Sequence, residues 1–232
     1  MIRARVLLFA VLTCLATQGR AQVITSNFNT DADGWTAYGG ADLGATISYS
    51  GAGGNGGTGA ITLNDPANGR YDYFLAPAKF TGDLAAYYGG ALNFDLKLNP
   101  AWDSIAETAM VILTGTFNSG TLAIGYLPAT GQYPTTGSFT TYSLALNTAT
   151  AWAVVDSSDF VTGTLATTPQ IQAVMSSISS LRILGDWTNS PDHVLLDNVT
   201  LTAIPEPSAL ALVSAAGFGA GLLVIRRRTA RR

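Results

Sequence analysis

Between residues 22 and 204 the sequence is divided into short runs of β-branched and aromatic residues by clusters of Gly, Asn, Thr and Ser. This division limits the fold more than any other feature, because many short strands between turn residues are typical of a β-sandwich or barrel. Residues 92–98 (LNFDLKL) alternate strictly, as in a strand with one buried and one wet face. The Gly-rich residues 51–59 (GAGGNGGTG) predict a flexible loop or hairpin end. The runs predict strands over 22–28, 45–49, 59–63, 71–75, 91–98, 109–116, 121–126, 138–146, 181–185 and 193–202.

One segment has helical periodicity instead. A Thr-Pro pair at 168–169 is followed by Ile171, Val174, Met175 and Ile178. Proline at the first helical position and an apolar spacing of three and four predict an amphipathic helix from residue 169 to about 180. The predicted fold class is therefore all-β: a jelly-roll β-sandwich with one short amphipathic helix that covers an open end or a face of the sheets.

The N-terminus has the pattern of a secretory signal peptide. Arg3 and Arg5 precede a short apolar stretch over 6–16, and small residues precede a cleavage point after Ala21. An alternative makes Cys14 a lipidated residue, although the residues before it fit that motif poorly. Cys14 is the only cysteine of the chain, so cleavage after residue 21 leaves a mature protein without disulfides.

The C-terminus has the pattern of a single membrane span. Residues 208–225 carry no charge and would form a helix of about 27 Å, close to the ~30 Å thickness of the hydrocarbon core. A basic cluster follows at once: Arg226, Arg227, Arg228, Arg231 and Arg232. Basic flanks stay in the cytoplasm, so the preceding domain faces outward, which agrees with the signal peptide.

The region between these termini is strongly acidic. Residues 22–204 hold four basic and fourteen acidic residues, a formal charge of −10. A nucleic-acid-binding surface needs clustered basic residues, so we expect no nucleic-acid partner. Neutral polymers, cations or other proteins are the better candidates, and solubility alone also explains the charge.

Pro205, Glu206 and Pro207, followed by the apolar stretch and the arginines, resemble the PEP-CTERM sorting signal. That resemblance implies recognition by an exosortase, a membrane-embedded protease of Gram-negative bacteria that make exopolysaccharide. It implies an inner-membrane intermediate whose domain lies outside the cytoplasm, followed by release to the outer envelope or the extracellular space. A permanent anchor behind a Pro-rich hinge is the alternative. The predicted organisation is a signal peptide over 1–21, one domain over 22–203 and a sorting segment over 204–232.

Four ordered blocks of the central domain resemble the laminin B (laminin IV type A) domain. They are residues 28–35 (FNTDADGW), 73–96, 111–115 (VILTG) and 173–201, which ends in LLDNVTL. The resemblance implies a galactose-binding-like jelly-roll of extracellular type without an established small-molecule ligand. Laminin-type cysteine-rich repeats are absent from the sequence, so the architecture of animal laminins does not transfer.

The sequence offers little for catalysis. His193 is the only histidine, and Glu107 is the only glutamate between residues 22 and 204. A triad needs a base beside a nucleophile, and no G-x-S-x-G motif is present. We therefore expect a non-enzymatic exported protein with a structural or adhesive role in a biofilm or exopolysaccharide matrix. The alternative is a carbohydrate-binding module for exopolysaccharide.

The sequence suggests two kinds of binding site, one for calcium and one for sugars. Asp31 and Asp33 could meet Asp197 to hold a structural calcium ion. An EF-hand is not expected, because Asn29 stands at its first position and Gly40 stands where its bidentate Glu is needed. The alternative is Asx-turn capping by Asp31 and Asp33, with Asp197 bonded to backbone amides. Seven of the aromatic residues either fill the core or form a sugar platform: Trp35, Tyr38, Tyr87, Tyr88, Trp102, Trp152 and Trp187. Those expected to be exposed, next to polar turn residues, are Tyr87, Tyr88 and Trp187.

Overall fold

The computed structural model describes residues 21–39, 45–66, 72–99, 108–129, 131–156, 161–188 and 191–204. Residues 1–20 of the predicted signal peptide, the Pro-Glu-Pro motif, the predicted membrane helix over 208–225 and the terminal arginines lie outside these ranges. Within them, no helix has the length and apolar character needed to cross a membrane. Residues Gln22–Ile204 form one compact unit.

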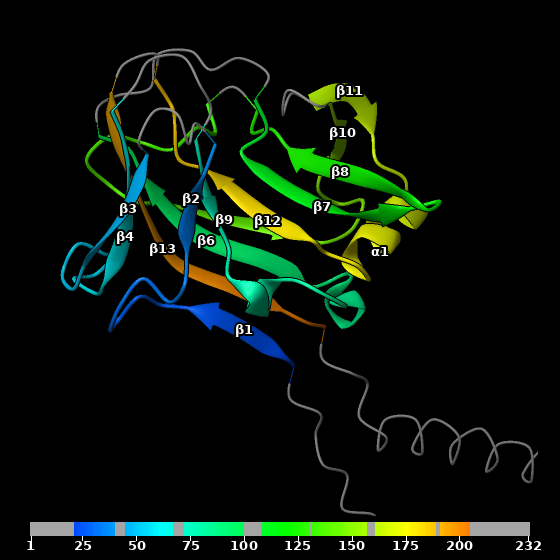
Figure 1. Ribbon diagram of the computed structural model, residues 1–232, viewed down its shortest axis with the longest axis horizontal. Helices are drawn as coiled ribbons and strands as arrows, with labels where there is room; N and C mark the ends of the chain where they lie inside the picture. The colour runs from blue at the N-terminus through cyan, green and yellow to red at the C-terminus, as the bar shows by residue number, and fades with distance from the viewer. Residues whose placement is uncertain are drawn as a thin grey trace, which may run out of the picture. The chain divides into compact units, whose positions relative to one another are not determined.

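Two antiparallel sheets form the layers of a sandwich (Figure 1). The first sheet has the order β3-β4-β13-β6-β9, with β1 also paired to β13. Its strands are β1 (Val23–Ser26), β3 (Thr46–Ser50), β4 (Ala60–Asp65), β6 (Ala91–Lys97), β9 (Thr140–Ala145) and β13 (Asp192–Thr202).

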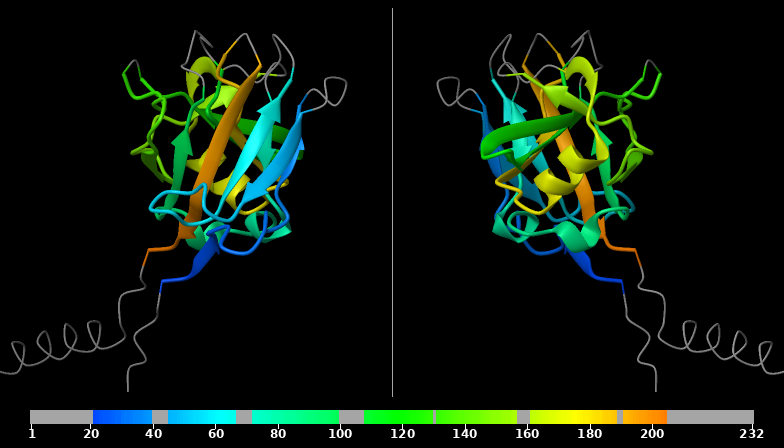
Figure 2. Two further views of the ribbon diagram at one scale, coloured as in Figure 1. Left: turned by 90° about the vertical axis from the view of Figure 1, so that its left-hand side faces the viewer. Right: turned by 90° about the vertical axis from the view of Figure 1, so that its right-hand side faces the viewer.

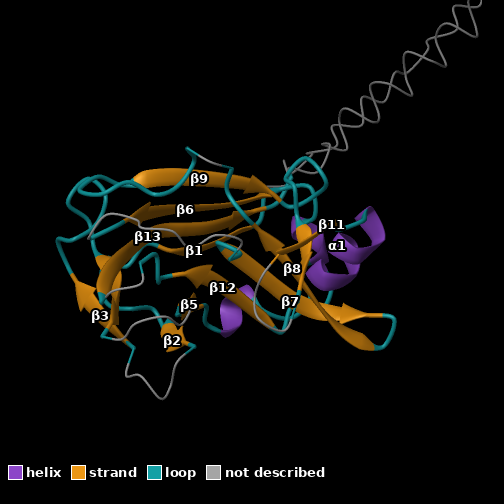
Figure 3. Cartoon of the chain, turned by 90° about the horizontal axis from the view of Figure 1, so that it is seen from above, coloured by secondary structure: helices purple, strands orange, loops and turns teal. Residues whose placement is uncertain are grey.

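The second sheet has the order β11-β10-β8-β7-β12-β5-β2. Its strands are β2 (Thr36–Tyr38), β5 (Tyr73–Leu75), β7 (Val111–Phe117), β8 (Gly120–Tyr126), β10 (Ala153–Val155), β11 (Val161–Leu165) and β12 (Ser180–Leu184). Viewed from above, β9, β6, β13 and β1 lie in one layer and β12, β7 and β8 lie in the other (Figure 3). The predicted all-β sandwich is therefore confirmed.

Strand β13 organises the first sheet, and it runs along much of the sandwich (Figure 2). One side of it pairs with β6, while the other side pairs with β4 over its first half and with β1 over its second half. The first and last strands of the domain are thus neighbours, and the backbone N–H of Ala203 donates to the carbonyl of Gln22 at 2.9 Å.

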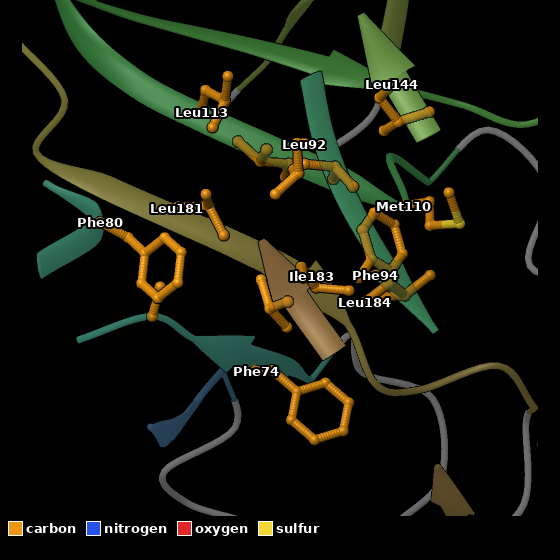
Figure 4. Close-up of a cluster of buried hydrophobic side chains, with 14 of the residues drawn as sticks. Phe74, Phe80, Leu92, Phe94, Met110, Leu113, Leu144, Leu181, Ile183 and Leu184 are labelled. Atoms are coloured by element: carbon orange, nitrogen blue, oxygen red, sulfur yellow. The ribbon is translucent and has the colours of Figure 1, made fainter. Parts of the chain in front are cut away.

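The core lies between the inner faces of the two sheets (Figure 4). The alternation of β6 was predicted correctly, because Leu92, Phe94 and Leu96 are fully buried. Leu92 and Phe94 face Leu181 and Ile183 of β12, which are also fully buried (Figure 4). Each such side chain contributes about 1.5–3 kcal/mol by leaving water. The hydrophobic pattern therefore decides which face of each sheet points inward.

One α-helix, α1 (Thr168–Met175), covers one end of the sandwich, as predicted. The backbone N–H of Thr167 donates to Oε1 of Gln170 at 2.8 Å and caps the first turn. The helix is shorter than predicted, because Ile178 leaves it to form a β-bridge with Gly82. Two short 3₁₀ turns, η1 (Ala78–Phe80) and η2 (Ala85–Tyr87), join β5 to β6.

Candidate functional site

Two aspartates lie side by side on the outer face of the first sheet. Asp95 of β6 and Asp197 of β13 are cross-strand partners, and their neighbours Phe94 and Leu196 point into the core. Although the outer face of a sheet usually meets water, Asp95 is only 4% exposed and Asp197 is fully buried. We call these two residues the carboxylate pair. Their burial comes from the Gly-rich loop, residues 51–59, which connects β3 to β4 and contacts the pair.

The Gly-rich loop is hydrogen-bonded to both carboxylates. The backbone N–H of Asn55 donates to Oδ2 of Asp197 at 2.8 Å, and the Thr58 hydroxyl donates to the same oxygen at 3.0 Å. The Asn55 side-chain amide donates to Oδ2 of Asp95 at 3.0 Å. From β9, the Thr141 hydroxyl donates to Oδ1 of Asp95 at 2.6 Å. The loop is therefore a hairpin end, as predicted, and it is held against the sheet.

A β-bulge places a further donor between the two carboxylates. The register of β13 against β6 shifts between Asp197 and Thr200, and Asn198 has a positive φ of 53°. Its backbone N–H donates to Oδ1 of Asp197 at 2.6 Å. Its side-chain amide donates to Oδ2 of Asp95 at 2.8 Å and to Oδ2 of Asp197 at 3.3 Å. The bulge thus turns Asn198 into a bridge across the pair.

The electrostatics of the pair follow from this enclosure. Burial raises the pKa of Asp197 above its ordinary value, and repulsion from Asp95 acts in the same direction. Hydrogen bonds from Asn55, Thr58 and Asn198 oppose the increase in the pKa. Every donor described above is uncharged, so the dipoles of N–H and O–H groups stabilise the pair. Chemically, the arrangement fastens the Gly-rich loop to the sheet and encloses both carboxylates.

Two glycines explain the composition of the loop. A Cβ atom at Gly54 would overlap Oδ2 of Asp197 and the carbonyl of Gly59. A Cβ atom at Gly59 would overlap the backbone carbonyl of Phe28, which is itself buried with a positive φ of 50°. These positions require glycine for close approach of backbone to neighbouring atoms. These two glycines of the loop, which was predicted to be flexible or a hairpin end, therefore let it pack tightly.

The N-terminal loop, residues 27–35, holds the other predicted acidic ligands. The backbone N–H of Asp33 donates to Oδ1 of Asp31 at 2.7 Å, which is the Asx turn that the sequence allowed. Asp33 forms an ion pair with Lys79, whose ammonium also donates to the carbonyl of Thr25 at 2.7 Å. Burial of Asp33 acts to raise its pKa, but the contacts with Lys79 and Ser26 outweigh it and lower the pKa.

The structure does not bring the three predicted calcium ligands together by any hydrogen bond or ion pair described above. Asp33 is paired with Lys79, whereas Asp197 is paired with Asp95. Across the described ranges, no group of three or more His, Cys, Asp or Glu side chains is placed to hold a metal ion. An ammonium neutralises Asp33, while N–H and O–H donors occupy the oxygens of Asp197.

The aromatic residues expected to be exposed are mostly buried. Tyr87 is 6% exposed and Trp187 is 2% exposed, and Tyr88 is half-buried against the core. The indole N–H of Trp187 donates to the carbonyl of Leu184 at 3.1 Å, and its ring meets Tyr133 edge to face at 6.1 Å. This corrects the prediction, because neighbouring turn residues do not determine which way an aromatic side chain points.

One of the seven aromatic residues considered for a sugar platform, but not among the three expected to be exposed, lies at the edge of the second sheet. Tyr38 of β2 is 46% exposed, and the guanidinium carbon of Arg182 lies 4.4 Å from its ring centroid. Arg182 also lies 5.1 Å from the ring centroid of Tyr73. The available sequence signal was an arginine inside the apolar strand 180–184 (SLRIL), because a buried cation needs nearby partners.

Comparison with known proteins gives a family and a fold. The family model "Laminin B (Domain IV)" matches residues 73–213, which is more than half of the chain. The solved L4b domain of human laminin alpha-2 is 15% identical with a TM-score of 0.48, covering 62% of this chain and 80% of that domain. No curated protein sequence matches the chain.

Solved carbohydrate-binding modules share the architecture. The family 11 module CtCBM11 is 17% identical with a TM-score of 0.50, covering 83% of this chain and 100% of that module. The family 11 module of the cellulase Lic26A-Cel5E of Clostridium thermocellum is 16% identical with a TM-score of 0.48, covering 80% of this chain and 97% of that module. At this level of identity the likeness shows the fold alone.

Proposed function

Because the chain belongs to the laminin B (Domain IV) family, we propose that it is an exported, non-enzymatic protein with a structural or adhesive role in the cell envelope or extracellular matrix. The family match carries the proposal. The matched residues, 73–213, include strands of both sheets and so cover much of the sandwich. The enclosure of the carboxylate pair supports the non-enzymatic part: a glycosidase needs two carboxyl groups that flank the substrate's scissile bond, and these two are covered by the Gly-rich loop.

Surface retention tests the adhesive role. A reporter joined to the signal peptide and residues 22–203, without the tail, should remain with the cell envelope or matrix fraction, whereas a reporter joined to the signal peptide alone should not. Equal retention of that reporter without the domain would place the adhesive function elsewhere.

We propose further that the tail is a sorting signal processed by an exosortase in a Gram-negative bacterium. Pro205, Glu206 and Pro207 form the recognition motif, the stretch over 208–225 anchors the intermediate transiently, and the terminal arginines fix its direction. Intact mass of the exported protein tests this proposal, because processing removes the tail and a permanent anchor keeps it. A protein that keeps residues 208–232 after export contradicts processing.

The alternative is a carbohydrate-binding module for exopolysaccharide, and the exposed ring of Tyr38 favours it. A glycan array probed with the purified exported protein tests this alternative directly. Binding to at least one glycan class is expected, and an array without any signal would reject it.

Structural calcium at Asp31, Asp33 and Asp197 stays a prediction. It requires Lys79 to release Asp33 and the donors at Asp197 to leave that carboxylate. Calorimetric titration with Ca²⁺ tests it: heat of binding together with a higher melting temperature supports the site, and the absence of both rejects it.

A further inference from the structure

Tyr38 lies at the edge of the second sheet. Strand β2 pairs only with β5 in that sheet, and Tyr38 is the cross-strand partner of Tyr73. Tyr73 is fully buried, whereas Tyr38 is 46% exposed. The two rings meet edge to face, with centroids 6.5 Å apart. An exposed ring is thus attached to the folded core through a buried one.

Arg182 fixes the orientation of the exposed ring. It lies in the apolar strand β12 and is only 6% exposed. Its guanidinium carbon lies 4.4 Å from the centroid of Tyr38 and 5.1 Å from the centroid of Tyr73, within the range of cation–π contacts. A planar guanidinium stacks on aromatic faces, so it covers one face of Tyr38. The exposed part of Tyr38 therefore does not include the face that the guanidinium covers.

This arrangement gives a flat ring that needs little ordering on binding. A side chain already held in one orientation loses less conformational entropy when a ligand covers it. The guanidinium on the covered face also limits which ligand charge the ring can accept. The guanidinium offsets the negative potential of the ring face, which disfavours a cation, and the formal charge of −10 over residues 22–204 disfavours a polyanion. A neutral ligand with a flat apolar face suits the site best.

We propose that the open face of Tyr38 is a stacking subsite for a pyranose ring of a neutral polysaccharide. This inference rests on the carbohydrate-binding alternative given above. The C–H face of a pyranose is flat, apolar and uncharged, and the Tyr38 hydroxyl lies at the ring edge, where it can bond the sugar's own hydroxyls. A protein partner is a poorer fit, because a stable interface needs about 800 Å² on each side and one ring supplies a small part of that.

The test compares two exposed tyrosines of neighbouring edge strands. Tyr49 of β3 is 38% exposed, similar to Tyr38, but no cation of the described ranges stacks on its ring. A neutral glycan is first identified with the unmodified exported protein on an array, and its affinity is then measured by calorimetry. Tyr38→Ala should weaken binding about tenfold or more, Tyr38→Phe about twofold, and Tyr49→Ala not measurably. Circular dichroism checks that each variant is folded.

The outcomes separate the subsite from the function. If the protein binds a neutral glycan and Tyr38→Ala binds it equally well, the subsite is wrong and the carbohydrate-binding function stands. An equal loss in Tyr49→Ala also contradicts the special role of the Arg182-backed ring. If the unmodified protein binds charged glycans only, or no glycan, both the neutral ligand and the subsite are rejected, while surface retention remains a separate test of adhesion.

Discussion

Aspartate carboxylates have opposite surroundings in the N-terminal loop and under the Gly-rich loop. In the N-terminal loop, Asp33 is partly exposed and is neutralised by an ammonium from Lys79. Under the Gly-rich loop, Asp95 and Asp197 are buried together and accept hydrogen bonds from uncharged donors. The first arrangement is an ordinary surface ion pair. In the second arrangement both carboxylates are buried, and their hydrogen-bond donors in the Gly-rich loop hold that loop in its path across the sheet.

This difference indicates which loop the fold depends on more. A surface pair contributes little because water already solvates both charges. The loss of a buried hydrogen-bond partner leaves groups without water or protein to replace it, which costs more. Substitutions under the Gly-rich loop should therefore destabilise the domain more than substitutions in the N-terminal loop.

Gly59→Ala should have the largest effect. The added methyl group would overlap the backbone carbonyl of Phe28, so either the N-terminal loop or the Gly-rich loop must move. We expect a loss of about 3 kcal/mol in the free energy of unfolding, measured by urea denaturation. Gly56→Ala is the matched control, because a Cβ atom there meets no neighbour and only its positive φ of 77° resists the change. A larger loss at Gly56 than at Gly59 would contradict the close contact.

Asp197→Ala should have the next largest effect. It removes the acceptor for Asn55, Thr58 and Asn198, and we expect a loss of about 2 kcal/mol in the free energy of unfolding. Because the loop is then released from the sheet, amide hydrogens of the Gly-rich loop should exchange faster than in the unmodified protein. Unchanged exchange in this loop would show that Asp197 does not hold it.

The comparison of the loops also shows what the sequence could and could not predict. Alternation in β6 placed Asp95 on the outer face correctly, because the side-chain period of a strand is local. Its burial could not be predicted, because the covering loop lies far earlier in the chain and contacts it only after folding. The bulge at Asn198 has no local signal either, since one extra residue is defined by pairing with β6.

The aromatic residues teach the same lesson. Tyr87 and Trp187 stand next to polar turn residues, yet both point into the core. Tyr38 stands in a three-residue strand with little pattern of its own, and its exposure follows from the position of β2 at a sheet edge. The fold class was predictable from periodicity, whereas the exposure of a single ring depends on the order of strands in the sheet.

The pH dependence of stability should have opposite signs at the two loops. The pKa of Asp197 is raised in the folded protein, so the part of its stability that comes from protonation is present below its ordinary value of 3.8 and is lost as pH rises through the raised pKa, while the hydrogen bonds to the loop remain. The pKa of Asp33 is lowered, so its contribution is present above 3.8 and is lost as pH falls through the lowered pKa. Melting temperatures measured at pH values below and above 3.8 test both directions of the change in stability.

Two variants separate these contributions to the pH profile. Asp197→Ala should lack the gain in stability that appears on acidification through the raised pKa. Asp33→Asn should lack the loss of stability that appears at pH values below 3.8. Profiles that run parallel to that of the unmodified protein in both variants would show that neither group titrates as its surroundings imply.

Asp33→Asn at neutral pH should have the smallest effect. It removes the charge of the ion pair but keeps an acceptor near Lys79, whose ammonium also donates to the carbonyl of Thr25. We expect a loss of about 0.5 kcal/mol in the free energy of unfolding, and the loss should shrink at high salt because exposed charges are screened. Lys79→Ala is the harsher control, since it also removes the bond to Thr25 and the contact with the Phe80 ring at 5.5 Å. If Asp33→Asn costs as much as Asp197→Ala, the contrast between a surface ion pair and a buried carboxylate pair does not hold.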